Sequence, residues 1–129
     1  MLRNALLGKI HQATVTHCDP EYSGSVTIDQ NLLDAAGIMP NEKVLVADCK
    51  SGARFETYVF RGERGSGAIG INGAAAKLSA PGNRVIIIAF CTLESDEFMA
   101  HRPRVVICNE DNGVAEVIEY EPAGAMASV

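Results

Sequence analysis

The first residues that could carry out a reaction are an adjacent glycine and serine, Gly24 and Ser25, between the turn pair Asp19-Pro20 and a β-branched segment. A glycine carbonyl is unhindered, and glycine tolerates strained backbone angles, so the serine hydroxyl could attack it and exchange the amide for an ester. β-Elimination would then cut the chain and leave dehydroalanine, which hydrolyses to a pyruvoyl group with loss of ammonia. Because Gly-Ser is a common turn dipeptide, the pair taken alone favours an ordinary turn.

Positively charged side chains form a second candidate group. Lys9 and His11 are evenly spaced, so they project to one face of an extended segment. Arg54 and Tyr58 share a face of another predicted strand for the same reason. A lysine and an arginine facing one cavity would suit a substrate with two carboxylates, because arginine can grip a carboxylate with two hydrogen bonds. A solvated strand face is the alternative, and spacing alone favours it.

Thr57 lies next to Tyr58, and strict alternation along a strand places the two side chains on opposite faces. A β-bulge or a subunit boundary would therefore be needed for both residues to serve one site.

The segment Asn72-Gly73-Ala74-Ala75-Ala76 is the third candidate. Small side chains after a glycine let a ligand approach backbone N–H groups, which could bind a carboxylate. A tight turn into a short helix explains the segment equally well. The sequence contains no Walker or G-x-G-x-x-G motif, which argues against a nucleotide ligand.

Composition limits the partners and the location. The net charge of −5 over 129 residues argues against a nucleic-acid partner, because phosphate binding needs a basic surface. The lack of a long basic tract gives no indication of an anionic membrane partner. The longest apolar run, residues 85–91, is too short to span a bilayer, and the N-terminal segment does not match a signal peptide. We therefore expect a cytoplasmic protein.

The cysteines stand at positions 18, 49, 91 and 108, far apart and without a C-x-x-C pair. Zinc sites usually need two close pairs of ligands, so the spacing gives little support for a metal site. We expect the four cysteines to be small buried apolar residues.

The elements that must position these residues are mostly strands. Alternating or β-branched patterns predict strands at residues 13–18, 25–28, 43–49, 53–60, 103–108 and 114–120. Turn signals at Ser51-Gly52 and at residues 111–113 predict that the strands on either side of each form a hairpin. The apolar run at residues 83–92 predicts a central strand that is buried on both faces.

Short helices and one tail complete the expected fold. Asp29 can cap a helix over residues 30–36, which Gly37 would end. Residues 94–100 and 74–78 could each form a short helical stretch. Residues 123–129 lack a pattern, so we expect a loose tail. Several short strands with few helices predict a single domain of 129 residues, mainly β, built as a small β-barrel.

An ordered set of motifs makes the chain resemble the pyruvoyl-dependent aspartate 1-decarboxylase family over roughly residues 1–92. The matching pieces are MLRNALLGKIH, ATVTH, YSGSVTID, LLDAAGI, NEKV, TYVF, GERGSG, INGAAA and PGNRVIIIAF. The resemblance implies a double-psi β-barrel that assembles as a homotetramer with active sites between subunits. It implies an enzyme, a carbon–carbon lyase that converts L-aspartate to β-alanine and CO₂ for pantothenate and coenzyme A biosynthesis.

The resemblance also implies how the site is made. The precursor is a zymogen that cuts itself between Gly24 and Ser25 into fragments 1–24 and 25–129. Ser25 then becomes the pyruvoyl cofactor, which forms a Schiff base with the substrate, so neither a metal nor pyridoxal phosphate is needed. Tyr58 would be the proton donor. The resemblance also implies that Thr57 helps in cleavage. It assigns substrate contacts to the following residues: Lys9, Arg54, Thr57, Asn72, Gly73, Ala74, Ala75 and Tyr22.

Two positions depart from the family pattern, since Glu21 and Lys77 stand where the family commonly has histidine. They could alter maturation or substrate affinity. The sequence does not decide whether maturation is spontaneous or needs a helper protein. Two alternatives to the implied function stay open: the same chemistry on another amino acid such as glutamate, and a non-catalytic barrel module, such as a regulator, that never cleaves.

Overall fold

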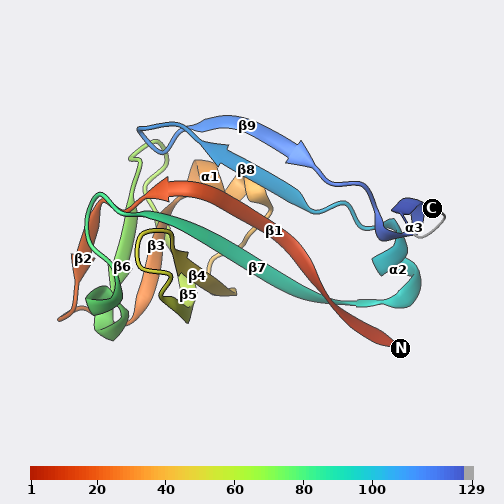
Figure 1. Ribbon diagram of the computed structural model, residues 1–129, viewed down its shortest axis with the longest axis horizontal. Helices are drawn as coiled ribbons and strands as arrows, with labels where there is room; N and C mark the ends of the chain where they lie inside the picture. The colour runs from red at the N-terminus through yellow and green to blue at the C-terminus, as the bar shows by residue number, and fades with distance from the viewer. Residues whose placement is uncertain (127–129) are drawn as a thin grey trace.

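A computed structural model describes residues 1–126 (Figure 1). The chain forms strands, short α-helices and one 3₁₀ helix in this order: β1 (Leu2–Thr14), β2 (His17–Asp19), β3 (Ser25–Asp29), α1 (Gln30–Ala36), β4 (Lys43–Asp48), β5 (Arg54–Gly62), β6 (Ile69–Asn72), η1 (Gly73–Leu78), β7 (Arg84–Glu94), α2 (Ser95–Ala100), β8 (Arg104–Cys108), β9 (Val114–Glu119) and α3 (Ala123–Met126). The predicted mainly β fold with short helices is confirmed.

All the strands belong to one curved sheet with the order β2-β6-β3-β5-β4-β7-β1-β8-β9. Most neighbours are antiparallel, but β3 runs parallel to β5, β2 to β6 and β1 to β8. Within residues 1–126, β2 and β9 are the edges of this sheet, and no pairing joins them. Closure into a double-psi barrel therefore stays an expectation from the family resemblance.

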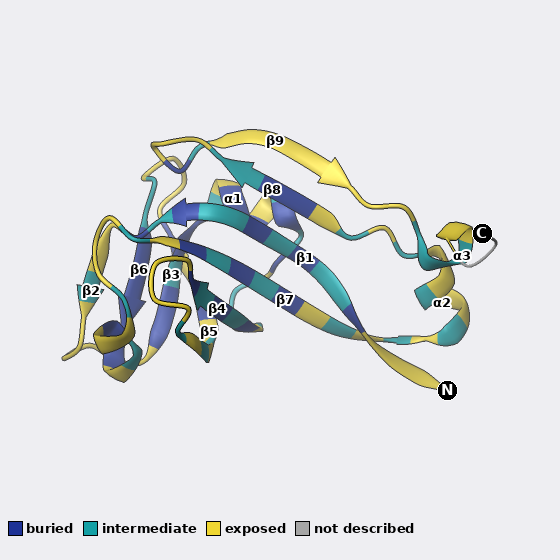
Figure 2. Cartoon of the chain, viewed as in Figure 1, coloured by how far each residue is buried: buried dark blue, intermediate teal, exposed yellow. Residues whose placement is uncertain are grey.

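The core lies on the concave side of the sheet and is built by alternating aliphatic residues. Ile10, Val26, Val46, Ile69 and Ile87 are all fully buried there. Figure 2 shows this alternation as dark bands along β1 and β7, whereas β9 is exposed along its whole length. Along β1, β4 and β7 one face fills the core and the other is more exposed, whereas β3 and β6 are buried on both faces over most of their length.

The strand at residues 83–92 was expected to be buried on both faces, and this is wrong. In β7, Val85, Ile87 and Ala89 are buried, whereas Ile86 and Ile88 are only half-buried and Phe90 is exposed. Within residues 1–126 the second face of β7 is only partly covered, so the continuous apolar run serves a fully buried core on one side only.

The predicted helix at residues 30–36 is confirmed. The Asp29 side chain accepts a hydrogen bond from the Asn31 N–H at the start of α1, and Gly37 ends the helix with φ of 75°. Both predicted hairpins, β4–β5 and β8–β9, are also present, as are the short helical stretches after residues 72 and 94.

The strand predicted at residues 13–18 is wrong as a single element. β1 ends at Thr14 and β2 begins at His17, because Val15 and Thr16 turn to bond Asn83 and Ile69. Residues 8–11 were expected to be extended, but no long strand was predicted over residues 2–12. These residues form one because β1 pairs with β7 on one side and β8 on the other, with two register shifts against β7.

The tail and the cysteines also differ from expectation. Residues 123–126 form the short helix α3 rather than a loose tail, and residues 127–129 lie outside the described part of the chain. Cys49 is exposed and the other cysteines are half-buried, so the prediction of four buried cysteines is wrong. Burial raises the pKa of the Cys108 thiol to about 11.

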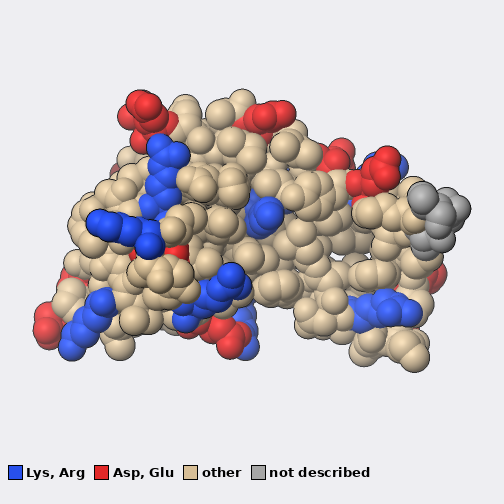
Figure 3. Space-filling view, in the orientation of Figure 1, with Lys and Arg blue, Asp and Glu red and all other residues tan. Residues whose placement is uncertain are grey.

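Two further observations concern partners. Over residues 1–126, no helix is both long enough and apolar enough to cross a bilayer. On the face drawn in Figure 3, lysine and arginine side chains stand in separate places among acidic ones and form no continuous track.

Candidate active site

Ser25 begins β3 and lies opposite Asn72, the last residue of β6. Both side chains are buried, with 2% and 4% of their surface exposed. Ser25 Oγ accepts a hydrogen bond of 3.0 Å from Asn72 Nδ2, and the same nitrogen donates to Thr27 Oγ1 at 3.0 Å. The structure therefore brings together two residues that the sequence analysis assigned to one site, and it holds the serine hydroxyl in a fixed place.

Gly24 provides access rather than strain. It is exposed, and no atom lies within 4 Å of the position that a Cβ would take. Its φ is not in the left-handed region, so the expected backbone strain is not found in this angle. The carbonyl before Ser25 is thus attached to a residue with open space beside it, which suits an attack by the neighbouring hydroxyl.

Gly73 packs against Gly24. A Cβ on Gly73 would lie 2.7 Å from Gly24 Cα, and the φ of Gly73 is +81°. Gly73 begins the short 3₁₀ helix η1, in which Ala74 is exposed and Ala75 packs partly against the core. The short-helix interpretation of this segment is confirmed, and its backbone reaches the proposed cleavage point; binding of a carboxylate there stays a prediction.

A small cavity of about 270 Å³ opens beside this pair of strands. It is lined by His17, Asp19, Tyr22, Thr27 and Asn72. Tyr22 and Asn72, both assigned to the site from the sequence, therefore face the same cavity.

The sequence analysis missed His17 and Thr27. His17 packs over Gly70, where a side chain would collide with the imidazole ring. Thr27 pairs with the same Gly70 from the other side. Alternation from Ser25 could have identified Thr27, because residues two apart on a strand share a face. His17 lies on a separate strand, and only the pairing of β2 with β6 brings it here.

Tyr58 and Thr57 occupy opposite faces of β5, as predicted. Val59 pairs with Val26 in the parallel β3–β5 ladder, so Tyr58 lies one residue from the start of β3. Tyr58 is 43% exposed on the outer face, and Thr57 pairs with the buried Val44. The β4–β5 register runs without a shift through both residues, so no bulge brings them to one side.

The structure does not bring Lys9 to Ser25 within one chain. Lys9 lies on β1 and pairs with Ile88 on the neighbouring strand β7. The strands β7, β4 and β5 lie between β1 and β3, which carries Ser25. Four strand spacings correspond to roughly 19 Å along the sheet. Arg54 lies on β5, four residues before Tyr58, or roughly 13 Å along the strand. Lys9 and Arg54 are therefore not neighbours of Ser25 within the sheet, and their common role in one site stays a prediction.

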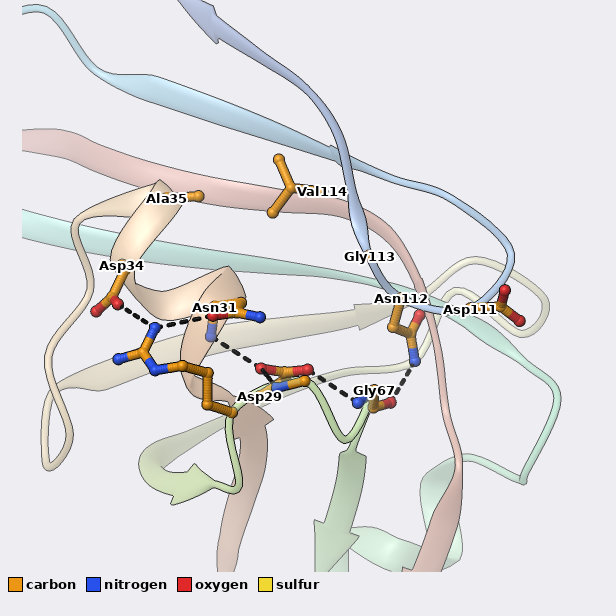
Figure 4. Close-up of a pocket in the computed structure, with 11 residues that line it drawn as sticks. Asp29, Asn31, Asp34, Ala35, Gly67, Asp111, Asn112, Gly113 and Val114 are labelled. Carbon is orange, nitrogen blue, oxygen red and sulfur yellow. Dashed lines mark hydrogen bonds and ion pairs between the residues drawn. The ribbon is translucent and has the colours of Figure 1, made fainter.

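A larger cavity, of about 690 Å³, lies away from these residues, beside the first turn of α1 (Figure 4). Its polar groups already bond one another. Asp29 accepts from the N–H groups of Gly65 and Gly67, and Arg64 donates to Asp34 at 2.7 Å. This cavity lies between α1 and the loop after β5. None of the residues predicted from the sequence to form the site lines it.

Comparison with known proteins adds an independent finding. Residues 1–115 match the family model described as aspartate decarboxylase. The chain belongs to the aspartate decarboxylase family. The match to this family extends past residue 92, where the resemblance was expected to weaken, and it includes every residue assigned to the site.

Curated relatives support the same conclusion, and each is named aspartate 1-decarboxylase. The protein from Neisseria meningitidis is 52% identical over 122 residues, covering 95% of this chain and 96% of the relative. The protein from Clostridium acetobutylicum is 51% identical, and that from Bacillus subtilis 46%, each over 95% of this chain and 97% of the relative. Membership in the aspartate decarboxylase family thus rests on residues 1–115 in the family model and on 95% of the chain in these relatives.

Proposed function

We propose that the chain is the precursor of a pyruvoyl-dependent aspartate 1-decarboxylase, which converts L-aspartate to β-alanine and CO₂. The observation that carries the proposal is the Ser25 hydroxyl, which is buried, held by Asn72 and adjacent to the open Gly24. Relatives that are about half identical bear the name of this activity, which supports aspartate as the substrate.

Maturation would use only residues of the chain. Ser25 Oγ attacks the Gly24 carbonyl carbon, the amide C–N bond breaks, and the hydroxyl proton passes to the freed nitrogen. Loss of the Ser25 α-proton then breaks the Cβ–O bond and leaves Gly24 with a free carboxylate. Water hydrolyses the resulting dehydroalanine and releases ammonia. The products are fragments 1–24 and 25–129, the second beginning with a pyruvoyl group.

The residues around Ser25 fit that group. Asn72 Nδ2 can donate to an oxygen on residue 25, and Asn72 also lines the adjacent cavity, where a small substrate would bind. A pyruvoyl group at residue 25 would supply a carbonyl for the substrate amine and an electron sink for decarboxylation, in place of a metal or pyridoxal phosphate. The protein's contribution is to orient the substrate and to supply a proton.

Tyr58 is the proposed proton donor, because it is exposed and lies next to the residue that pairs with β3. Its phenol would protonate the substrate carbon after CO₂ leaves. The N–H groups of Gly73, Ala74 and Ala75 would contact a substrate carboxylate, and Tyr22 and Asn72 would line the site.

Lys9 and Arg54 would bind substrate carboxylates across a subunit boundary. Lys9 lies four strands along the curved sheet from Ser25, and Arg54 lies at the opposite end of β5 from the residues that pair with β3. Thr57 faces away from Tyr58, so it too would act on a site shared between copies. This arrangement supports the homotetramer with active sites between subunits that the family resemblance implies.

The setting of the enzyme is part of the proposal. We place it in the cytoplasm, where β-alanine would supply pantothenate and coenzyme A biosynthesis. Maturation could proceed spontaneously or with a helper protein, and purified protein distinguishes these cases.

Intact-mass spectrometry of the purified protein tests the proposal. We expect fragments 1–24 and 25–129, with the second lighter by one ammonia than a chain that begins with serine. Ser25→Ala should give a full-length, folded and inactive chain, because no hydroxyl is left to attack. A Ser25→Ala chain that still splits after residue 24 would contradict the intramolecular mechanism.

Turnover assays separate the alternatives. The mature protein should release CO₂ from L-aspartate and form β-alanine. Faster turnover of glutamate would favour the same chemistry on a different amino acid. A wild-type chain that stays uncut and inactive both when purified and when incubated in an extract of its own cells would favour the non-catalytic module.

A further inference from the structure

One amide group in the site contacts two hydroxyl groups. Asn72 Nδ2 is 3.0 Å from Ser25 Oγ and 3.0 Å from Thr27 Oγ1. Ser25 and Thr27 are two residues apart on β3, so their side chains share a face, and Asn72 lies opposite Ser25 in the ladder. The Asn72 nitrogen therefore bridges the serine that would cut the chain and a threonine that the proposed reaction does not use.

The second bond decides how the amide is oriented. The terminal torsion of an asparagine is broad, so one hydrogen bond to Ser25 leaves the amide free to turn. An NH₂ group has two hydrogens, and the Thr27 bond occupies the second one. Threonine is β-branched and therefore stiff at χ1, which makes it a firm anchor.

The orientation of the amide in turn restricts the Ser25 hydroxyl. Asn72 Nδ2 can only donate, so Ser25 Oγ accepts this bond with one lone pair and points its own hydrogen elsewhere. The second lone pair of Ser25 Oγ is therefore restricted in direction. Gly24, whose carbonyl carbon this oxygen would attack, is the preceding residue in the chain.

We propose that Thr27 is a positioning residue for self-cleavage: by holding the Asn72 amide, it fixes the Ser25 hydroxyl for attack on the Gly24 carbonyl. This inference rests on the proposed function, because it concerns the rate at which the precursor cuts itself. It assigns Thr27 no contact with the substrate.

The test compares Thr27→Val, which keeps the shape but removes the hydroxyl, with Thr27→Ser, which keeps the hydroxyl. Freshly purified precursor is followed by intact mass as fragment 25–129 appears. Thr27→Val should mature roughly tenfold more slowly than wild type, and Thr27→Ser should restore most of the rate. Thr92→Val, on the exposed part of β7, is the matched control and should mature like wild type.

A crystal structure of the uncut Thr27→Val chain supplies a second readout. We expect its Asn72 amide to have turned away from Ser25 Oγ, and the amide of the Thr27→Ser chain to keep both bonds. If Thr27→Val does not fold, Thr27→Ala gives the same comparison, with thermal unfolding to show that it is folded.

The outcomes separate this inference from the proposed function. A wild-type chain that never cuts itself overturns both. A wild-type chain that matures while Thr27→Val matures equally fast overturns only the role of Thr27. Equal slowing in Thr27→Val and Thr27→Ser also overturns it, since the hydroxyl would then not be the feature that matters.

Discussion

The backbone of Gly24 lies directly against Gly73, so that a Cβ on Gly73 would come within 2.7 Å of Gly24 Cα. Gly73 also has a φ of +81°, which L side chains rarely adopt. Gly24, the last residue before the proposed cut, therefore packs against the first residue of η1. This contact links the chain segment around residue 24 to the Asn72 end of β6.

Gly73→Ala should disturb the contact between Gly73 and Gly24. The added methyl collides with backbone atoms and meets an unfavourable φ, so we expect the free energy of unfolding to fall by about 1–3 kcal/mol. Maturation should also slow, because Gly24 must move. Denaturant unfolding and intact mass measure the two effects.

Gly52→Ala is the matched control for that change. Gly52 has a similar φ of +77° but no atom within 4 Å of its Cβ position. Gly52→Ala should show how much the free energy of unfolding falls because of the backbone angle alone. Equal losses in stability and in maturation for the two variants would mean that the contact with Gly24 is unimportant.

Tyr58→Phe and Thr57→Val should separate turnover from maturation. Tyr58→Phe removes the phenolic proton, so cleavage should survive while decarboxylation of aspartate slows by roughly a hundred- to ten-thousandfold. Thr57→Val should accumulate uncut precursor if its hydroxyl stabilises the oxyanion formed at Gly24. Gel electrophoresis and steady-state kinetics measure each variant. The assignment fails if fully matured Tyr58→Phe turns over aspartate at the wild-type rate.

Substrate choice should depend on the side-chain carboxylate. Aspartate should react about a hundredfold faster than asparagine, since losing a charge-assisted contact costs on the order of 2–3 kcal/mol. Arg54→Gln should narrow this preference, whereas Arg102→Gln, an exposed arginine on the loop before β8, should not. Comparable kcat/KM values for both substrates in the wild-type enzyme would contradict a role for cations in binding.

Asp48 should make stability depend on pH. Burial alone would raise the pKa of this carboxyl, but hydrogen bonds from Ser79, Asn83 and the N–H groups of Ser51 and Lys50 lower it to about 2. Because the folded pKa lies below the ordinary value of 3.8, the carboxylate stabilises the fold above about pH 4. That contribution, about 2 kcal/mol, should be lost as pH falls from about 4 to about 2.

Urea unfolding of Asp48→Asn across this range checks the expectation. The free energy of unfolding of the variant should be lower than that of wild type at pH 7, and the difference between the two should shrink toward pH 2. Asp34→Asn is the control, since the exposed Asp34 carboxyl has a lowered pKa through its bonds to Arg64 and Gln30 but lies in water. If the difference in free energy of unfolding between Asp48→Asn and wild type stays constant with pH, titration of Asp48 does not control stability in this range.

The sequence by itself determined the local elements and the reactive pair. The cap at Asp29, the stop at Gly37 and the two hairpin turns are set by neighbouring residues, because capping and turn geometry depend on a few adjacent backbone angles. Gly24 and Ser25 are adjacent in the chain, so the chemistry that they could perform was also evident before any fold was known.

Only the tertiary structure decided which distant residues share a site. The β3–β6 ladder brings Asn72 to Ser25 and Thr27, and the β2–β6 ladder adds His17. The same sheet order keeps Lys9 several strands from Ser25, although the family resemblance had assigned both to one site. Strand pairing and register depend on burial across the whole core, a long-range balance that no local pattern encodes.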